Sequence, residues 1–171
     1  ISKQVDDIGT LVDEFSSFAR MPKPEMKIDD FTKTIKESFD LFSNAHTNIN
    51  FKLNAPKEKI MFYFDRFQLT QALNNLIKNA IEAVSRIPNP AVNINYLKKN
   101  NQLFIFIIDN GIGVNITNIR KLYEPYFTTK EKGTGLGLSI VKKIIEDHKA
   151  IIKIEKNKEQ AGSTASIIFN L

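Results

Sequence analysis

The chain has 171 residues, of which 42% are hydrophobic and 25% charged, and this composition is that of an ordinary globular protein. This composition excludes a chain that is disordered along its whole length, because disordered chains combine few apolar residues with a high net charge. The absence of cysteine excludes disulfides, zinc–thiolate sites, iron–sulfur clusters and thiol nucleophiles, and the net charge of +5 is too evenly spread to predict a nucleic-acid partner.

The first twenty residues predict a helix with an apolar seam. Its apolar positions alternate at spacings of four and three residues: Ile1, Val5, Ile8, Val12, Phe15 and Ala19. Such a seam is typical of a helix that pairs with another helix, and it also fits a helix docked on its own domain. Pro22 and Pro24 end this pattern, so we expect a linker over residues 21–28. The chain starts without Met in the middle of the pattern, which suggests a piece of a longer protein.

The next segment predicts two helices separated by short strands. Asp29 and Asp30 are suitable caps for a helix that ends near His46. Residues 49–54 alternate apolar and polar side chains as a half-buried strand does, and residues 59–64 form a second short strand candidate. A long helix is expected from Asp65 to about Ile87.

The second half of the chain predicts four strands and one helix. Strands are expected at 91–97 and 102–109, joined by a polar hairpin loop, and at 150–156 and 163–169. Residues 103–108 are all apolar, so we expect this strand to be buried on both faces. With a helix over 138–148, the pattern predicts an α/β (α+β) two-layer sandwich. Its sheet is mixed and mostly antiparallel, with helices on one face.

Glycine is concentrated in one part of the chain. Five of the seven glycines are residues 111, 113, 133, 135 and 137. The run Gly133–Ser139 leads into a helix, and backbone N–H groups at such a start bind anions such as phosphate. A flexible loop before a helix is the alternative interpretation. Neither the P-loop pattern nor G-x-G-x-x-G is present, which excludes two common nucleotide-binding motifs.

Two further features are candidates for ligand binding. Asp109 ends the apolar strand and directly precedes Gly111 and Gly113, where its carboxylate is able to accept from an exocyclic amine or to form a turn. The helix 65–87 carries its leucines on one face and Gln71, Asn75 and Asn79 on the other. Amide oxygens are suitable ligands for Mg²⁺, although a solvated polar face would look the same.

Taken in order, these motifs resemble the catalytic ATP-binding domain of sensor histidine kinases, within the superfamily of gyrase, heat-shock chaperone, kinase and mismatch-repair ATPases. The resemblance covers about residues 29–171. Its motifs are an asparagine box at 71–83, a first glycine box at 109–114, a phenylalanine box at 123–130 and a second glycine box at 132–140. The run Glu124–Lys130 is most similar to nitrogen-regulation sensor kinases.

The resemblance implies ATP and Mg²⁺ as ligands, with the ATP site between the helices and a lid over about residues 116–137. It implies that Asn79 binds the metal, that Asn75 and Lys130 join it in catalysis, and that Asp109 accepts from the adenine amine. The implied nucleotide contacts are Asn75, Asn79, Asp109, Gly111, Gly113, Tyr126, Phe127, Thr128, Thr129, Lys130, Gly133, Thr134, Gly135, Leu136, Gly137, Leu138 and Thr164. Thr164 is expected to support Asp109 and the adenine.

The sequence also departs from the family pattern. No segment matches the box that carries the phosphoacceptor histidine, and His46 and His148 are expected to be structural. Residues 1–20 resemble the second helix of the dimerisation and phosphotransfer hairpin, so the acceptor is expected elsewhere in the parent. Gln71 stands where relatives often carry a glutamate base, which a kinase tolerates better than a hydrolase because imidazole attacks without a strong base.

The resemblance therefore implies transfer of the ATP γ-phosphoryl group to a histidine on the parent's acceptor helix, for relay to a response regulator. A homodimer through the N-terminal helix, a cytoplasmic domain and an inner-membrane parent are expected. Two alternatives stay open. One is a nucleotide-binding or dimerisation module without catalysis, and the other is an ATP-hydrolysing member of the same superfamily.

Overall fold

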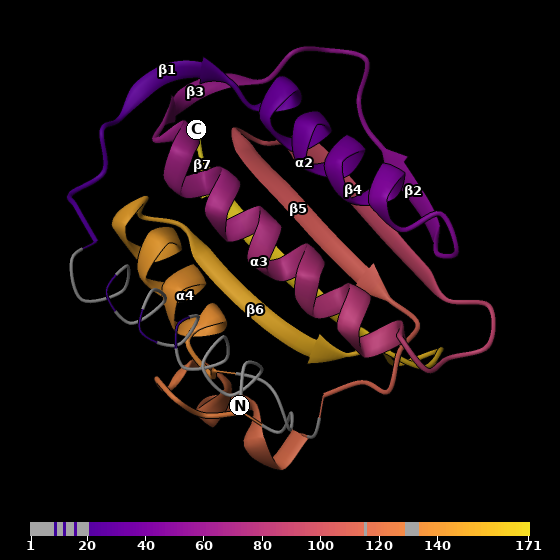
Figure 1. Cartoon of the computed structure of the whole chain (residues 1–171). Helices are drawn as coiled ribbons and strands as arrows, with labels where there is room; N and C mark the ends of the chain where they lie inside the picture. The colour runs from indigo at the N-terminus through magenta and orange to yellow at the C-terminus, as the bar shows by residue number, and fades with distance from the viewer. Residues whose placement is uncertain (1–8, 10–11, 13–15, 17–20, 115, 129–133) are drawn as a thin grey trace.

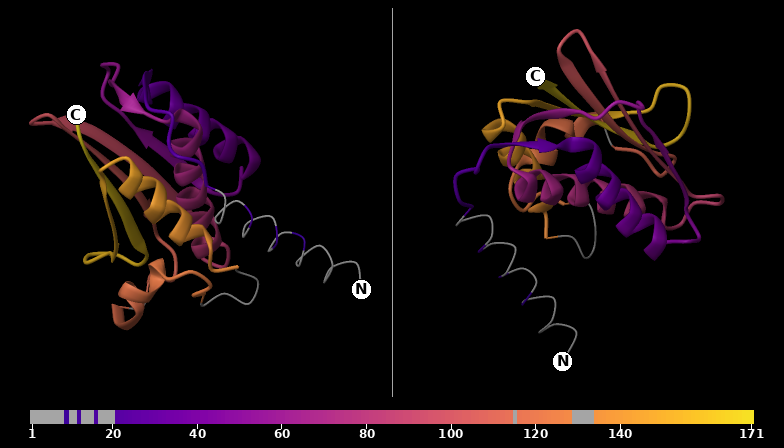
Figure 2. Two further views of the ribbon diagram at one scale, coloured as in Figure 1. Left: turned by 90° about the vertical axis from the view of Figure 1, so that its left-hand side faces the viewer. Right: turned by 90° about the horizontal axis from the view of Figure 1, so that it is seen from above.

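One face of a five-stranded sheet is covered by three helices in the computed structural model of the chain, which describes residues 9, 12, 16, 21–114, 116–128 and 134–171 (Figures 1 and 2). The strands lie in the order β2 (Asn50–Asn54), β4 (Ala91–Lys99), β5 (Gln102–Asp109), β7 (Ser163–Asn170) and β6 (Ile151–Lys156). The helices are α2 (Phe31–Ala45), α3 (Arg66–Val84) and α4 (Gly137–Asp147). The pairs are antiparallel except β2 with β4, which confirms the predicted two-layer fold.

A second, two-stranded sheet joins the start of the domain to the segment before α3. It pairs β1 (Lys27–Asp30) with β3 (Met61–Phe64) in antiparallel register. Strand β1 was not predicted, and its first two residues fall within the expected linker. The reason is that β1 lacks alternating burial: Lys27 and Ile28 are both exposed.

Two aspartates begin the helices that cover the sheet. Asp30 caps α2 by accepting from the N–H of Lys33, and Asp65 caps α3 by accepting from the N–H of Gln68 at 3.0 Å. Helix α3 ends at Val84, before the expected end near Ile87. Beyond Val84 the chain forms a turn with hydrogen bonds between residues three apart, such as Ile87 N–H to the Val84 carbonyl, and Pro88 follows.

The central strand β5 alternates in burial, and the expectation of burial on both faces was therefore wrong. Residues 103, 105 and 107 lie buried beneath the helices, whereas Phe104, Phe106 and Ile108 are half-buried on the face that no described helix covers. The hairpin to β4 was correctly predicted. Its two loop residues, Asn100 and Asn101, both have positive φ, as a type I′ turn requires.

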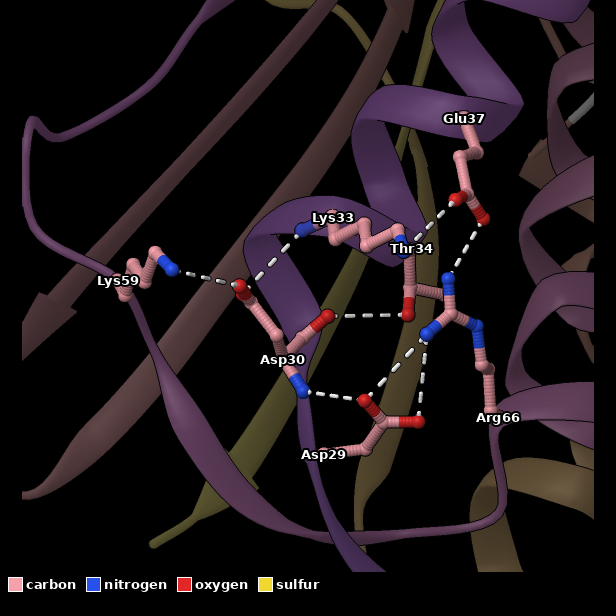
Figure 3. Close-up of polar contacts among 7 residues, drawn as sticks. All are labelled: Asp29, Asp30, Lys33, Thr34, Glu37, Lys59 and Arg66. Atoms are coloured by element: carbon pink, nitrogen blue, oxygen red, sulfur yellow. Dashed lines mark hydrogen bonds and ion pairs between the residues drawn. The ribbon is translucent and has the colours of Figure 1, made fainter.

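A cluster of charged side chains joins β1, α2 and α3 (Figure 3). The Arg66 guanidinium lies 3.4 Å from the Asp29 carboxylate and 2.7 Å from the Glu37 carboxylate. The Asp30 N–H also donates to Asp29, and this bond together with Arg66 lowers the pKa of Asp29. The cluster therefore fixes the start of α3 against the small sheet.

The N-terminal helix expected over residues 1–20 lies largely outside the described residues. Gly9, Val12 and Ser16 are described and are helical. Val12, one of the seam positions, has 54% of its surface exposed. Across the described part of the chain, no helix has the combination of length and apolar character needed to cross a bilayer.

Phe31 connects the small sheet to the large one. Its side chain is fully buried, and its ring makes an edge contact with Tyr96 of β4 at 5.4 Å between centroids. It also lies 6.0 Å from the ring of Phe62 and 6.4 Å from that of Phe64, both in β3.

We expect Phe31→Ala to lower the free energy of unfolding by about 3–5 kcal/mol, because it leaves a cavity among three aromatic rings. Phe67→Ala is the matched control, since 78% of Phe67 is exposed, and it should change stability by less than about 0.5 kcal/mol. Urea unfolding followed by circular dichroism measures both. Equal losses in the two variants would contradict a core role for Phe31.

Candidate functional site

Asp109 is a buried carboxylate at the end of β5. Only 6% of the residue is exposed, and its Oδ1 accepts from the N–H of Gly111 at 2.8 Å and from the N–H of Ser163 at 3.2 Å. Burial raises the pKa of Asp109 above its ordinary value, and the two N–H donors oppose this shift. Among the described residues, no hydrogen bond reaches Oδ2. One carboxylate oxygen is thus fixed, while the other remains available to an external donor.

The chain passes close to Asp109 at two glycines. A Cβ atom at Gly111 would collide with the main-chain carbonyl of Ala83 near the end of α3. Gly162 has φ of +100°, and a Cβ there would collide with the carbonyl of Asp109 itself. The end of β5 therefore lies directly against both α3 and the start of β7.

One face of α3, here called the amide face, carries Gln71, Asn75 and Asn79, and Asn75 on this face lies beside the start of α4. Asn75 Nδ2 donates to the Gln71 carbonyl at 3.1 Å, and Asn75 Oδ1 lies 3.5 Å from the position that a Cβ would occupy at Gly137. Asn79 follows one turn later and is half-buried. Helix α4 begins at Gly137 without a side-chain cap, so its first N–H groups have no side-chain acceptor at the cap position. The expected asparagine box and second glycine box therefore meet.

The phenylalanine box folds back on the second glycine box. It follows a 3₁₀ helix, η1 (Ile116–Tyr123). The Tyr126 N–H donates to the Gly135 carbonyl at 3.1 Å, and both residues have positive φ. A Cβ at Gly135 would collide with the Tyr126 main chain. Of the expected contact residues here, Phe127, Thr128 and Thr134 are described, whereas Thr129, Lys130 and Gly133 lie outside the described residues.

Three residues near Asp109 were not among the expected site residues. These are Gly162, Ser163 and Asn157, whose Nδ2 donates to the Asp109 carbonyl at 2.9 Å. Thr164 was expected to support Asp109; its hydroxyl donates to Asn157 Oδ1 at 2.7 Å, and Asn157 in turn contacts Asp109. The turn composition of residues 157–162 was visible in the sequence, but its register against Asp109 depends on the pairing of β5 with β7.

The donor set fits a metal that relies on amides and on a phosphate ligand. Among the described residues there is no group of three or more histidine, aspartate or glutamate side chains able to hold a metal ion. Amide oxygens on α3 suit Mg²⁺, which keeps several waters and is held largely through substrate phosphates. The residues present are therefore compatible with Mg²⁺ that arrives with a nucleotide.

We expect Asp109→Asn to fold and to gain stability relative to the wild type as the pH rises. Asn retains an Oδ1 acceptor for both N–H donors and removes the buried charge. A carboxyl group whose pKa is raised on folding stabilises the fold most below its unfolded pKa, and this contribution is lost as the pH rises through the folded pKa. Urea unfolding at a series of pH values from below 4 to 7 measures the difference. Glu159→Gln, at an exposed turn position, is the control. A constant difference between Asp109→Asn and wild type would contradict the expected burial cost.

Comparison with known proteins places these features in one family. Residues 64–171 match the model of the histidine kinase-, DNA gyrase B-, and HSP90-like ATPases. The chain is 41% identical over 168 residues to the nitrogen regulation protein NtrY of Azorhizobium caulinodans, covering 95% of this chain and 22% of that protein. It is 32% identical to a putative NtrY-like sensor histidine kinase of Rickettsia felis, covering 100% of this chain and 28% of that protein. The chain thus spans about a quarter of the length of these relatives.

Solved structures agree with the sequence comparison. The nucleotide-free catalytic domain of the histidine kinase ThkA superposes with a TM-score of 0.76 at 30% identity, over 85% of this chain and 95% of that one. ThkA in complex with the response regulator TrrA gives a TM-score of 0.80 at 26% identity, over 98% of this chain and 48% of that one. The chain therefore belongs to the histidine kinase-, DNA gyrase B- and HSP90-like ATPases, and within them to the catalytic ATP-binding domains of sensor histidine kinases.

Proposed function

We propose that the chain binds ATP with Mg²⁺ and donates the γ-phosphoryl group to a histidine on a preceding helix of its parent protein. The single observation that carries this proposal is the buried Asp109 carboxylate, held through one oxygen at the end of β5, where Gly111 lies against Ala83 near the end of α3. Its second oxygen is suited to accept from the exocyclic amine of adenine. Family membership supports the same assignment.

The phosphates would then lie between α3 and the start of α4. Asn79, with Asn75 beside it, would hold Mg²⁺, and the N–H groups at Gly135, Leu136 and Gly137 would face the phosphates. Thr128, Thr129 and Lys130 would contribute from the phenylalanine box. Mg²⁺, when bound, would neutralise charge on the phosphate oxygens.

The transfer itself requires little from the chain beyond positioning. An imidazole nitrogen of the acceptor attacks the γ-phosphorus, the bond to the β–γ bridging oxygen breaks, and ADP leaves with that electron pair. Gln71 has no carboxylate and is not suited to activate water as a base. This difference favours transfer to histidine over hydrolysis.

Further features of the parent follow from the same proposal. The phosphoryl group would pass from the histidine to a response regulator, the class of partner bound by ThkA in its solved complex. The parent would dimerise through the helix expected over residues 1–20. The domain would work in the cytoplasm, and the parent would be an inner-membrane sensor.

Calorimetric titration with a nonhydrolysable ATP analogue tests the nucleotide site. We expect Mg²⁺ to strengthen binding, Asn79→Ala to weaken it about tenfold and to remove most of the Mg²⁺ effect, and Asp109→Asn to abolish it. Lys78→Ala is the matched control, because Lys78 is the exposed neighbour of Asn79 on the same helix. Absence of binding to the folded wild type would contradict the ATP site.

Transfer is tested separately by adding the parent's acceptor helix and labelled ATP. We expect an acid-labile, base-stable phosphohistidine to form on that helix. Steady release of phosphate at the same rate without the helix would instead indicate a hydrolase. Tight binding without transfer or release in the complete parent would indicate a nucleotide-binding module.

A further inference from the structure

The turn between β6 and β7 is attached to the end of β5 by one side chain, Asn157. Its Nδ2 donates to the carbonyl of Asp109 at 2.9 Å and to the carbonyl of Ala161 at 3.0 Å. Its Oδ1 accepts from the Thr164 hydroxyl at 2.7 Å, and its own N–H donates to the Gly162 carbonyl at 3.0 Å. Every donor of Asn157 is thus used within the turn or on Asp109.

The orientation of this amide is fixed by chemistry. The two carbonyls around Nδ2 are only able to accept, so the NH₂ group must face them. The oxygen is then left facing Thr164, whose hydroxyl supplies the donor. An aspartate at this position would place an oxygen against two carbonyl oxygens, and it would lose both bonds without any change in size.

The bond from Asn157 adds a main-chain contact to the two hydrogen bonds that hold the Asp109 side chain. Ser163 N–H and Gly111 N–H hold the carboxylate through Oδ1, and Asn157 holds the main-chain carbonyl of the same residue. Gly162 lies so close to that carbonyl that no Cβ fits between them. With both the main chain and Oδ1 fixed, the direction of Oδ2 is set by the β6–β7 turn as well as by β5.

We propose that Asn157 is a positioning residue for nucleotide recognition, and that Thr164 acts through it. The inference rests on the proposed ATP site. Asn157 fixes the residue that accepts from the adenine amine, and Thr164 fixes the Asn157 amide. Thr164 therefore contributes to adenine selection through its bond to Asn157.

The test compares two nucleotides that differ only at the amine. ATP and purine riboside triphosphate, which lacks the 6-amino group, are titrated into wild-type chain, Asn157→Asp, Thr164→Val and the exposed-turn control Gln160→Ala. We expect Asn157→Asp to weaken ATP binding about tenfold and purine riboside triphosphate binding by less than about twofold. Thr164→Val retains both Asn157 donors and should weaken ATP binding about threefold in the same selective manner. Gln160→Ala should change neither affinity.

Each other outcome has a distinct meaning. Equal weakening of both nucleotides by Asn157→Asp would show a merely structural role for the turn, and unchanged binding of both would show no role; either result overturns the inference. If Asn157→Asp does not fold, the selectivity of Thr164→Val decides in the same way. A wild type that binds neither nucleotide, or binds both equally, contradicts the proposed adenine contact of Asp109 itself.

Discussion

The burial of one face of α3 sets the geometry of the site. This helix contacts β4 and β5 beneath it and α2 and α4 beside it. Leu69, Leu73 and Ile77 are fully buried, which leaves one rotation of the helix about its axis compatible with the core. In that rotation Asn75 lies next to the start of α4. The direction of the Asn75 amide is thus a consequence of hydrophobic packing on the opposite side of the helix.

Local patterns were sufficient to predict most of the fold. The alternation of residues 49–54, the capping aspartates Asp30 and Asp65, and the hairpin at Asn100–Asn101 each carry their signal within a few residues. Strand β1 was missed because its pairing with β3 is nonlocal and its residues do not alternate in burial. The half-exposed Phe104 and Phe106 misled the burial prediction, since an apolar strand does not reveal whether a second layer exists.

The site shows the same division between local and nonlocal information. The glycine boxes and Asp109 were recognisable from their composition and spacing. Asn157 was not, because it is separated from Asp109 by 48 residues and its role depends on the order in which β5, β7 and β6 pair. Sequence motifs predicted the residues proposed to face the nucleotide, whereas the residues that hold Asp109 in place required the tertiary structure.

The buried Asp109 carboxylate lowers the stability of the folded domain. A buried carboxylate loses hydration, and its two N–H donors replace that hydration only in part. An asparagine would fill the same space without charge. Retaining the charged residue is a pattern typical of functional sites, where the geometry needed for binding is kept at the expense of stability.

The dependence of Asp109 on Ser163 and Asn157 has a consequence for the dynamics of the domain. Both partners belong to the β6–β7 hairpin, so a local opening of that hairpin releases Asp109 from two of its hydrogen bonds. By thermodynamic linkage, a ligand on Asp109 must oppose this opening. Amide hydrogens of β6 and β7 would then exchange more slowly when the nucleotide is bound. Nucleotide binding would thus be detectable in the two strands β7 and β6 at one edge of the sheet.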